Sequence, residues 1–199
     1  MEFSSIFLFI ITFASILILP GPNSAFAVGQ SLKFGLVGSL AVPLGFMTAT
    51  GLHAALVFSG VGLVIKEYAL ILTLLKWLGV LYLAYLGYKS FISKPSKIEV
   101  CPQEIPKLKM YFSALLVSLT NPKALLASLM VYPLFINSDS SYSIQAIVLT
   151  LSAMLVSFLV YSTYSLAAAK LKDRLNSSSF SNKCVGSLYL AAASVLATK

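Results

Sequence analysis

The sequence predicts an all-α, polytopic membrane protein whose six transmembrane helices form two inverted three-helix repeats. Three observations predict this fold: long apolar blocks, helix-breaking motifs at matching places in the two halves, and a short motif that occurs once in each half. Of the 199 residues, 58% are hydrophobic and 10% are charged, whereas a soluble domain of this length carries about 25% charged residues. The chain therefore has no room for a sizeable soluble domain.

Six apolar segments follow one another along the chain. A membrane span needs about 20 predominantly apolar residues, and only the last segment is barely long enough. The segments cover residues 3–28, 36–65, 69–92, 110–136, 144–169 and 183–198. We expect a single transmembrane domain over residues 1–199, with repeat 1 over about 1–92, a polar linker over about 93–109 and repeat 2 over about 110–199.

The first segment is interrupted by Pro20-Gly21-Pro22-Asn23. Proline removes a backbone N–H and clashes with the preceding helical turn, and glycine loosens the backbone beside it. In lipid, the freed backbone groups are tolerated only where they are buried in protein or line a wet cavity. The nearby sequence Ala-Phe-Ala at residues 25–27 resembles a signal-peptide cleavage site, but no Lys or Arg precedes the apolar run. We therefore expect a retained, broken helix.

The fourth segment carries a matching break at Asn121-Pro122-Lys123, roughly a hundred residues after the first. Paired interruptions at corresponding places in two halves are the best sequence indication of a transporter's substrate site. Each break also contains an asparagine, whose amide can bind a ligand. The alternative interpretation is that both breaks are kinks that only shape helix packing.

A second internal match supports the duplication. Residues 76–84 read KWLGVLYLA and residues 183–191 read KCVGSLYLA, so that Lys, Gly, Leu, Tyr, Leu and Ala coincide in order. The two motifs fall in the third and the sixth segment. An odd number of spans in each repeat inverts the second repeat in the membrane.

The net charge of +8 indicates orientation rather than a nucleic-acid partner, because the basic residues lie in short loops between apolar segments. Loops on one side hold Lys33, Lys89, Lys94, Lys97, Lys107, Lys109, Lys170, Lys172, Arg174 and Lys183. The opposite loops hold only Lys66 and the terminal Lys199. Positive residues stay in the cytoplasm, so we expect both termini to be extracytoplasmic and the linker to be cytoplasmic.

Taken together, these motifs resemble the LysE/RhtB family of amino-acid exporters (lysine exporter and homoserine-threonine efflux type) over nearly the whole chain. The resemblance rests on Pro20 to Asn23, on Gly35, Gly38, Gly45 and Gly51 in the second segment, on Lys76, Gly79, Tyr82, Leu83 and Gly87 in the third, and on Asn121, Pro122 and Lys123. It implies a secondary transporter that exports amino acids or closely related small metabolites across the bacterial inner membrane. It also implies proton coupling and a homo-oligomer embedded in lipid.

The breaks suggest how a zwitterionic amino acid is bound. Helix N-termini offer N–H groups to its carboxylate, while unwound carbonyls and the amide oxygens of Asn23 and Asn121 accept from its ammonium. A charge such as Lys123 within a span either contacts an anion or reaches the interface. Lys76 is a candidate charge partner, or an interfacial residue near the end of its helix. The expected substrate-binding residues are Pro20, Gly21, Pro22, Asn23, Asn121, Pro122 and Lys123.

One departure from the family bears on coupling. Many relatives place an acidic or polar residue just after the second-segment glycine, where this chain has Leu52. All six acidic residues fall in loops or at helix ends, although a membrane carboxylate is the usual proton carrier. His53, the single histidine, is the intramembrane side chain that ordinarily titrates near neutral pH. It is a candidate for proton coupling, or else a hydrogen-bonding residue between packed helices.

Two other classes of function compete with transport. A membrane thiol or electron-transfer protein would place cysteines at the breaks, but Cys101 lies in the linker and Cys184 near the start of the sixth segment. Both are predicted on the reducing cytoplasmic side. A non-transporting scaffold would not need polar breaks at mid-span. No residue set has the spacing of a metal site or a hydrolytic triad, so we expect neither a cofactor nor enzymatic activity.

Overall fold

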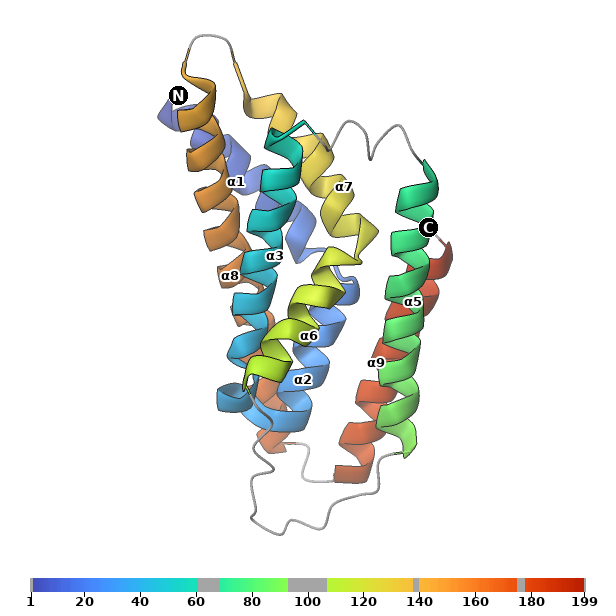
Figure 1. The fold of residues 1–199 in the computed structure, drawn as a ribbon. Helices are drawn as coiled ribbons and strands as arrows, with labels where there is room; N and C mark the ends of the chain where they lie inside the picture. Colours follow the sequence, from blue (N-terminus) through green and yellow to red (C-terminus); the bar gives the residue numbers. More distant parts are fainter. Residues whose placement is uncertain (1, 61–68, 93–106, 138–139, 175–177, 199) are drawn as a thin grey trace.

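The computed structural model describes residues 2–60, 69–92, 107–137, 140–174 and 178–198, and within these ranges the chain is helical with no β-strand (Figure 1). The described elements are α1 (Phe3–Ile18), α2 (Pro22–Ser39), α3 (Ala41–Phe58), α5 (Ala69–Ile92), α6 (Lys107–Leu119), α7 (Pro122–Val131), the 3-10 helix η1 (Tyr132–Phe135), α8 (Tyr142–Arg174) and α9 (Ser178–Thr198). The predicted all-α class is confirmed. Most of the predicted linker lies outside the described residues.

Both predicted breaks are present as sharp bends. The axes of α1 and α2 differ by 65°, and those of α6 and α7 together with η1 differ by 62°. Proline is the first residue of both helices that follow a break, Pro22 in α2 and Pro122 in α7. The first position of a helix suits proline, because its N–H would lack an intrahelical partner in any case. The proline that ends one helix geometry therefore also starts the next.

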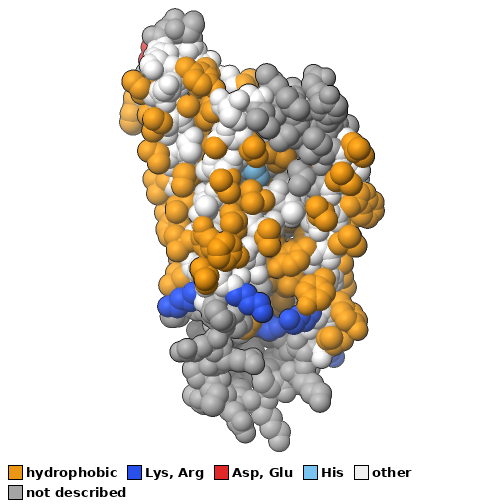
Figure 2. Space-filling view, viewed as in Figure 1, with side chains coloured by type: hydrophobic (Ala, Val, Ile, Leu, Met, Phe, Trp, Pro, Cys, Tyr) orange, Lys and Arg blue, Asp and Glu red, His pale blue; other side chains and the backbone are white. Residues whose placement is uncertain are grey.

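The described helices account for up to four membrane crossings by length and composition. Ala41–Phe58 and Tyr142–Leu171 are each long and apolar enough to cross, and each broken pair passes the same test when it is taken as one span. Helices α5 and α9 coincide with the third and sixth predicted segments, so six crossings stay a prediction. Figure 2 shows apolar side chains spread over the visible face and a band of lysines near its lower end.

The helices pair in a way that an inverted repeat predicts. The two broken pairs lie beside each other and run in opposite directions, α1 to α2 downward and α6 to α7 upward (Figure 1). Helix α3 packs against α8, and α5 packs against α9. Each described helix of the first predicted repeat thus contacts its counterpart in the second.

Glycines set the closeness of these contacts. A Cβ atom on Gly45 of α3 would lie 2.5 Å from the Tyr111 carbonyl oxygen of α6, and one on Gly186 of α9 would lie 3.2 Å from the Gly87 carbonyl oxygen of α5. Small residues of this kind let helix backbones approach in a bilayer. Gly35, with a φ of 72°, interrupts α2, and the chain reaches α3 only at Ala41. The second predicted segment, placed from residue 36, therefore begins five residues too early.

Two aromatic clusters lie on either side of the first break. On the α1 side, Phe9 and Phe13 pack against Tyr132, with ring centroids 5.6 and 5.8 Å apart. On the α2 side, Phe46 packs against Tyr161 of α8 at 4.7 Å. All five rings are buried, and their burial stabilises the bundle around the level of the breaks.

Candidate substrate site at the two helix breaks

The two breaks are joined by a direct hydrogen bond between their asparagines. Asn121 Nδ2 donates to Asn23 Oδ1 at 2.8 Å, and Asn23 Nδ2 donates to Ser118 Oγ at 3.0 Å. Asn23 and Asn121 are each 3% exposed, and the Tyr161 side chain is also hydrogen-bonded to Asn23. Buried polar groups need partners, and here the amides of the two breaks supply them to each other. We call this set of residues, together with the caps described below, the polar layer.

The breaks are capped differently. Asn121 precedes α7 as its N-cap, and its Oδ1 accepts from the Lys123 backbone N–H at 3.1 Å, as N-cap side chains do. The N-cap of α2 is Gly21, whose N–H donates to Ser24 Oγ at 2.8 Å, while that hydroxyl donates back to the Gly21 carbonyl at 2.9 Å. Asn23 lies inside α2. It is therefore left to bond across the interface rather than to cap its own helix.

Lys123 reaches from the second break to the first. Its Nζ donates to the backbone carbonyl of Leu19, just after α1, and the Tyr164 hydroxyl of α8 donates to the carbonyl of Ile18. The last carbonyls of a helix have no intrahelical partner, and these two are satisfied from the other half of the chain. The ammonium of Lys123 lies beside Gly21, because a Cβ on that residue would be 3.5 Å from Nζ.

His53 lies at the second break. It projects from α3, is 2% exposed, and is hydrogen-bonded to the backbone carbonyl of Leu119 at the end of α6. Within the described structure its Nε2 has no hydrogen-bond partner. The broken helix of one half is thus capped by a helix of the other: α8 and Lys123 serve α1, and α3 serves α6.

The structure brings together six of the predicted site positions and places the rest less completely. Pro20, Gly21, Pro22 and Asn23 meet Asn121 and Lys123 at the polar layer, and Pro122 opens α7 beside them. The side chain of Lys76 lies outside the described part of α5. No ligand role of these residues is tested by the geometry alone.

Three further side chains belong to the polar layer and carry only a weak sequence signal. Ser118, Tyr161 and Tyr164 are isolated hydroxyls within apolar helices, a position in which they also serve as ordinary packing residues. Their roles depend on partners more than 90 residues away in the sequence. Among the described residues, no group of three or more His, Cys, Asp or Glu side chains could hold a metal ion.

Comparisons with known proteins agree with a membrane transport family. An uncharacterized membrane protein from Vibrio cholerae is 28% identical over 183 residues, which cover 90% of this chain and 89% of that protein. A homoserine/homoserine lactone efflux protein from Salmonella typhimurium is 25% identical over 202 residues, which cover 100% of this chain and 98% of that protein. A leucine efflux protein from Salmonella choleraesuis is 27% identical over 190 residues, with coverages of 92% and 90%.

No solved structure matches the chain. The family model described as LysE type translocator matches residues 14–199, which include both breaks and every described helix from α2 onward. The chain therefore belongs to the LysE family of translocators.

Proposed function

We propose that this protein exports amino acids or closely related small metabolites across the bacterial inner membrane, and that the polar layer is its substrate site. Membership of the LysE family supports export, as do full-length relatives named for the efflux of homoserine and of leucine. The observation that carries the choice of site is the 2.8 Å hydrogen bond between Asn121 and Asn23, which joins the two breaks in the protein interior.

The helix ends at the polar layer suit a zwitterion. Helices α2 and α7 begin there, so their N-termini present N–H groups and the positive ends of their dipoles to a carboxylate. Helices α1 and α6 end there, and their carbonyls suit an ammonium, as in transporters with broken helices. The two asparagine amides are bonded to each other in this conformation, so substrate entry requires their separation. The proposed binding residues are Pro20, Gly21, Pro22, Asn23, Asn121, Pro122 and Lys123.

Transport is proton-coupled in this proposal, with His53 as the residue that carries or gates the proton. Its support is its burial at the end of α6 and its free Nε2. The protein works as a homo-oligomer in lipid, and Lys76 remains a candidate charge partner. Neither alternative, a thiol or electron-transfer protein or a non-transporting scaffold, is favoured by an observation on the described residues.

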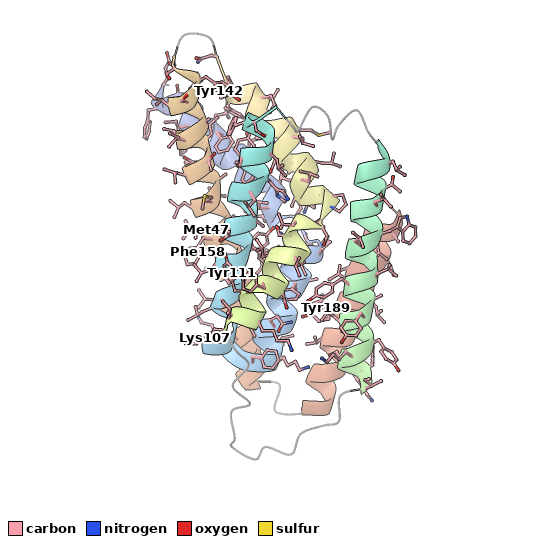
Figure 3. All side chains as sticks on the ribbon, in the orientation of Figure 1. Met47, Lys107, Tyr111, Tyr142, Phe158 and Tyr189 are labelled. Carbon is pink, nitrogen blue, oxygen red and sulfur yellow. The ribbon has the colours of Figure 1, made fainter. Side chains whose placement is uncertain are left out.

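The proposed orientation places both termini outside the cytoplasm and the linker of residues 93–109 inside. Lys33, Lys89, Lys107, Lys109 and Lys170 belong to helix ends that Figure 1 draws at the lower end of the bundle. Figure 3 labels Lys107 there and Tyr142 at the opposite end. The lysine-rich end is the cytoplasmic one by the positive-inside rule.

An efflux assay tests the proposed function. Cells that lack their own amino-acid exporters are loaded with a panel of dipeptides, and extracellular amino acids are measured with and without expression of this chain. We expect at least one amino acid of the panel to accumulate outside faster when the chain is expressed. Equal accumulation for every amino acid, with the protein present in the membrane, would contradict export.

A further inference from the structure

We propose that the carbonyl end of α1 is a seat for a primary ammonium group, which Lys123 occupies in this conformation and which the ammonium of the substrate takes over during transport. In this exchange the displaced Lys123 pairs with the carboxylate of the same substrate. The inference rests on the proposed function, because it names how that site recognises its substrate. It makes Lys123 the residue that distinguishes an amino acid from the corresponding amine.

The seat arises because α1 lacks local donors at its end. The residue after Leu19 is Pro20, which has no N–H, and the N–H of Gly21 is taken by Ser24 Oγ at 2.8 Å. The carbonyls of Ile18 and Leu19 therefore accept from side chains of the other half, the Tyr164 hydroxyl and the Lys123 ammonium. They also form the negative end of the α1 dipole, which favours a cation.

Lys123 matches the group that we expect it to yield to. Its ammonium carries three N–H donors on a primary carbon chain, as does the α-ammonium of an amino acid. It reaches the seat because α7 starts one residue earlier, at Pro122, and because Gly21 has no side chain. A Cβ there would lie 3.4 Å from Lys123 Cδ and 3.5 Å from Nζ. An ammonium bound at this place lies beside the backbone of the first break, within the proposed substrate site.

The exchange keeps every charge partnered. Before it, the Lys123 ammonium is bound by the Leu19 carbonyl. After it, the substrate ammonium holds that carbonyl, and the released Lys123 faces the substrate carboxylate near the N-terminus of α7. An amine that lacks a carboxylate would displace Lys123 without giving it an anion, and a desolvated charge without a partner is strongly destabilising. Lys123 therefore excludes amines while it admits amino acids.

The test compares amino acids with their carboxylate-free analogues. Purified protein in proteoliposomes is assayed for exchange of leucine and of homoserine, with 3-methylbutylamine and 3-aminopropan-1-ol as the respective competitors. Lys123→Gln keeps a hydrogen-bond donor and removes the charge. We expect amino-acid exchange to fall about 10- to 100-fold, as when a hydrogen bond to a charged group is lost. We expect inhibition by the matched amine to become stronger than in the wild type, because no cation must be displaced.

Two variants serve as controls. Lys123→Arg keeps the charge and should keep the preference for the amino acid, whereas Lys109→Gln removes an exposed lysine of α6 outside the breaks and should behave as the wild type. Elution as a single folded species in size-exclusion chromatography is required of each variant. A proportional fall of amino-acid exchange and amine inhibition in Lys123→Gln would overturn the seat, as would unchanged values of both.

A binding measurement separates this inference from the proposed function. Stabilisation of purified protein by 3-methylbutylamine is measured as a shift in the thermal midpoint, which needs no transport. A wild type that exchanges neither amino acid nor any other member of the panel contradicts the proposed function. Equal stabilisation of the wild type and Lys123→Gln by the amine contradicts the seat, whatever the exchange assay shows.

Discussion

His53 and Tyr164 satisfy backbone carbonyls that the helix breaks leave without intrahelical partners. His53 of α3 is bonded to the carbonyl of Leu119 in α6, and Tyr164 of α8 donates to the carbonyl of Ile18 in α1. Thr50 of α3 and Ser157 of α8 are bonded to each other at 3.0 Å between these helices. Residues of α3 and α8 therefore play corresponding parts in the two halves. A movement of either helix would change how a break is capped, which links the caps to transport.

Substitution of His53 separates capping from proton coupling. His53→Gln retains a donor for the Leu119 carbonyl but cannot titrate. We expect reconstituted His53→Gln protein to retain substrate exchange at equal pH and to lose uphill transport under an imposed pH gradient. Uphill transport by the wild type should depend on that gradient. Uphill transport by the variant at near the wild-type rate would make His53 a capping residue only.

The sequence predicts where the breaks lie, but not how their side chains are paired. Pro20, Pro22 and Pro122 determine the interruptions through local backbone chemistry, which one sequence reveals. The Asn121–Asn23 bond and the contact of Lys123 with Leu19 join residues about a hundred positions apart. Such pairings follow from packing of the whole bundle. For Lys123, the sequence suggested an anion contact or a position at the interface, whereas the structure shows a carbonyl partner at the first break.

At the scale of elements, close helix packing holds the broken helices in register. Gly45 of α3 faces the backbone of α6, where a Cβ would lie 2.5 Å from the Tyr111 carbonyl oxygen and 2.9 Å from Ala114 Cβ. Tyr111 in turn donates from its hydroxyl to Thr48 Oγ1 at 2.9 Å. These contacts fix α6 against α3 just below the His53 cap. The glycine spacing noted in the sequence thus corresponds to a real interhelical contact.

Replacement of Gly45 tests this packing. Gly45→Ala places a methyl group against backbone that cannot move aside, so we expect the free energy of unfolding to fall by about 1–3 kcal/mol, as for overpacked cores. Gly51→Ala on the same helix is the matched control, because its added Cβ meets the flexible Met154 side chain at 3.0 Å. Thermal midpoints in detergent give the comparison. Equal midpoints for the two variants would show that α3 and α6 are not packed this closely.

At the scale of the whole molecule, counterpart helices meet in pairs: α3 with α8, α5 with α9, and the two broken pairs with each other. The repeated Lys-Gly-Leu-Tyr-Leu-Ala motif falls in α5 and α9, which pack through Gly87 and Gly186. The sequence predicted the helix positions well because apolar blocks and loop residues are local signals. The crossings by α5 and α9 and the orientation of the bundle depend on the membrane, and both remain predictions.

Labelling of a cysteine in the linker tests the orientation. In a Cys184→Ser background, Cys101 should resist an impermeant maleimide in intact cells and react after permeabilisation, because the linker is predicted to be cytoplasmic. Ser59→Cys, introduced at the exposed end of α3, should react in intact cells and serves as the matched control. Reaction of Cys101 before permeabilisation would reverse the proposed topology.

The joining of the two breaks into one substrate site is tested most directly by substrate exchange in proteoliposomes that contain Asn23→Ala or Asn121→Ala protein. Each substitution removes one side of the 2.8 Å hydrogen bond. Asn137→Ala, at an exposed asparagine outside the breaks, controls for the loss of an amide. We predict that both break variants insert into the membrane normally and show no measurable exchange, while Asn137→Ala exchanges as the wild type does. Exchange at wild-type rates by both break variants would show that the breaks only shape helix packing and that the substrate site lies elsewhere.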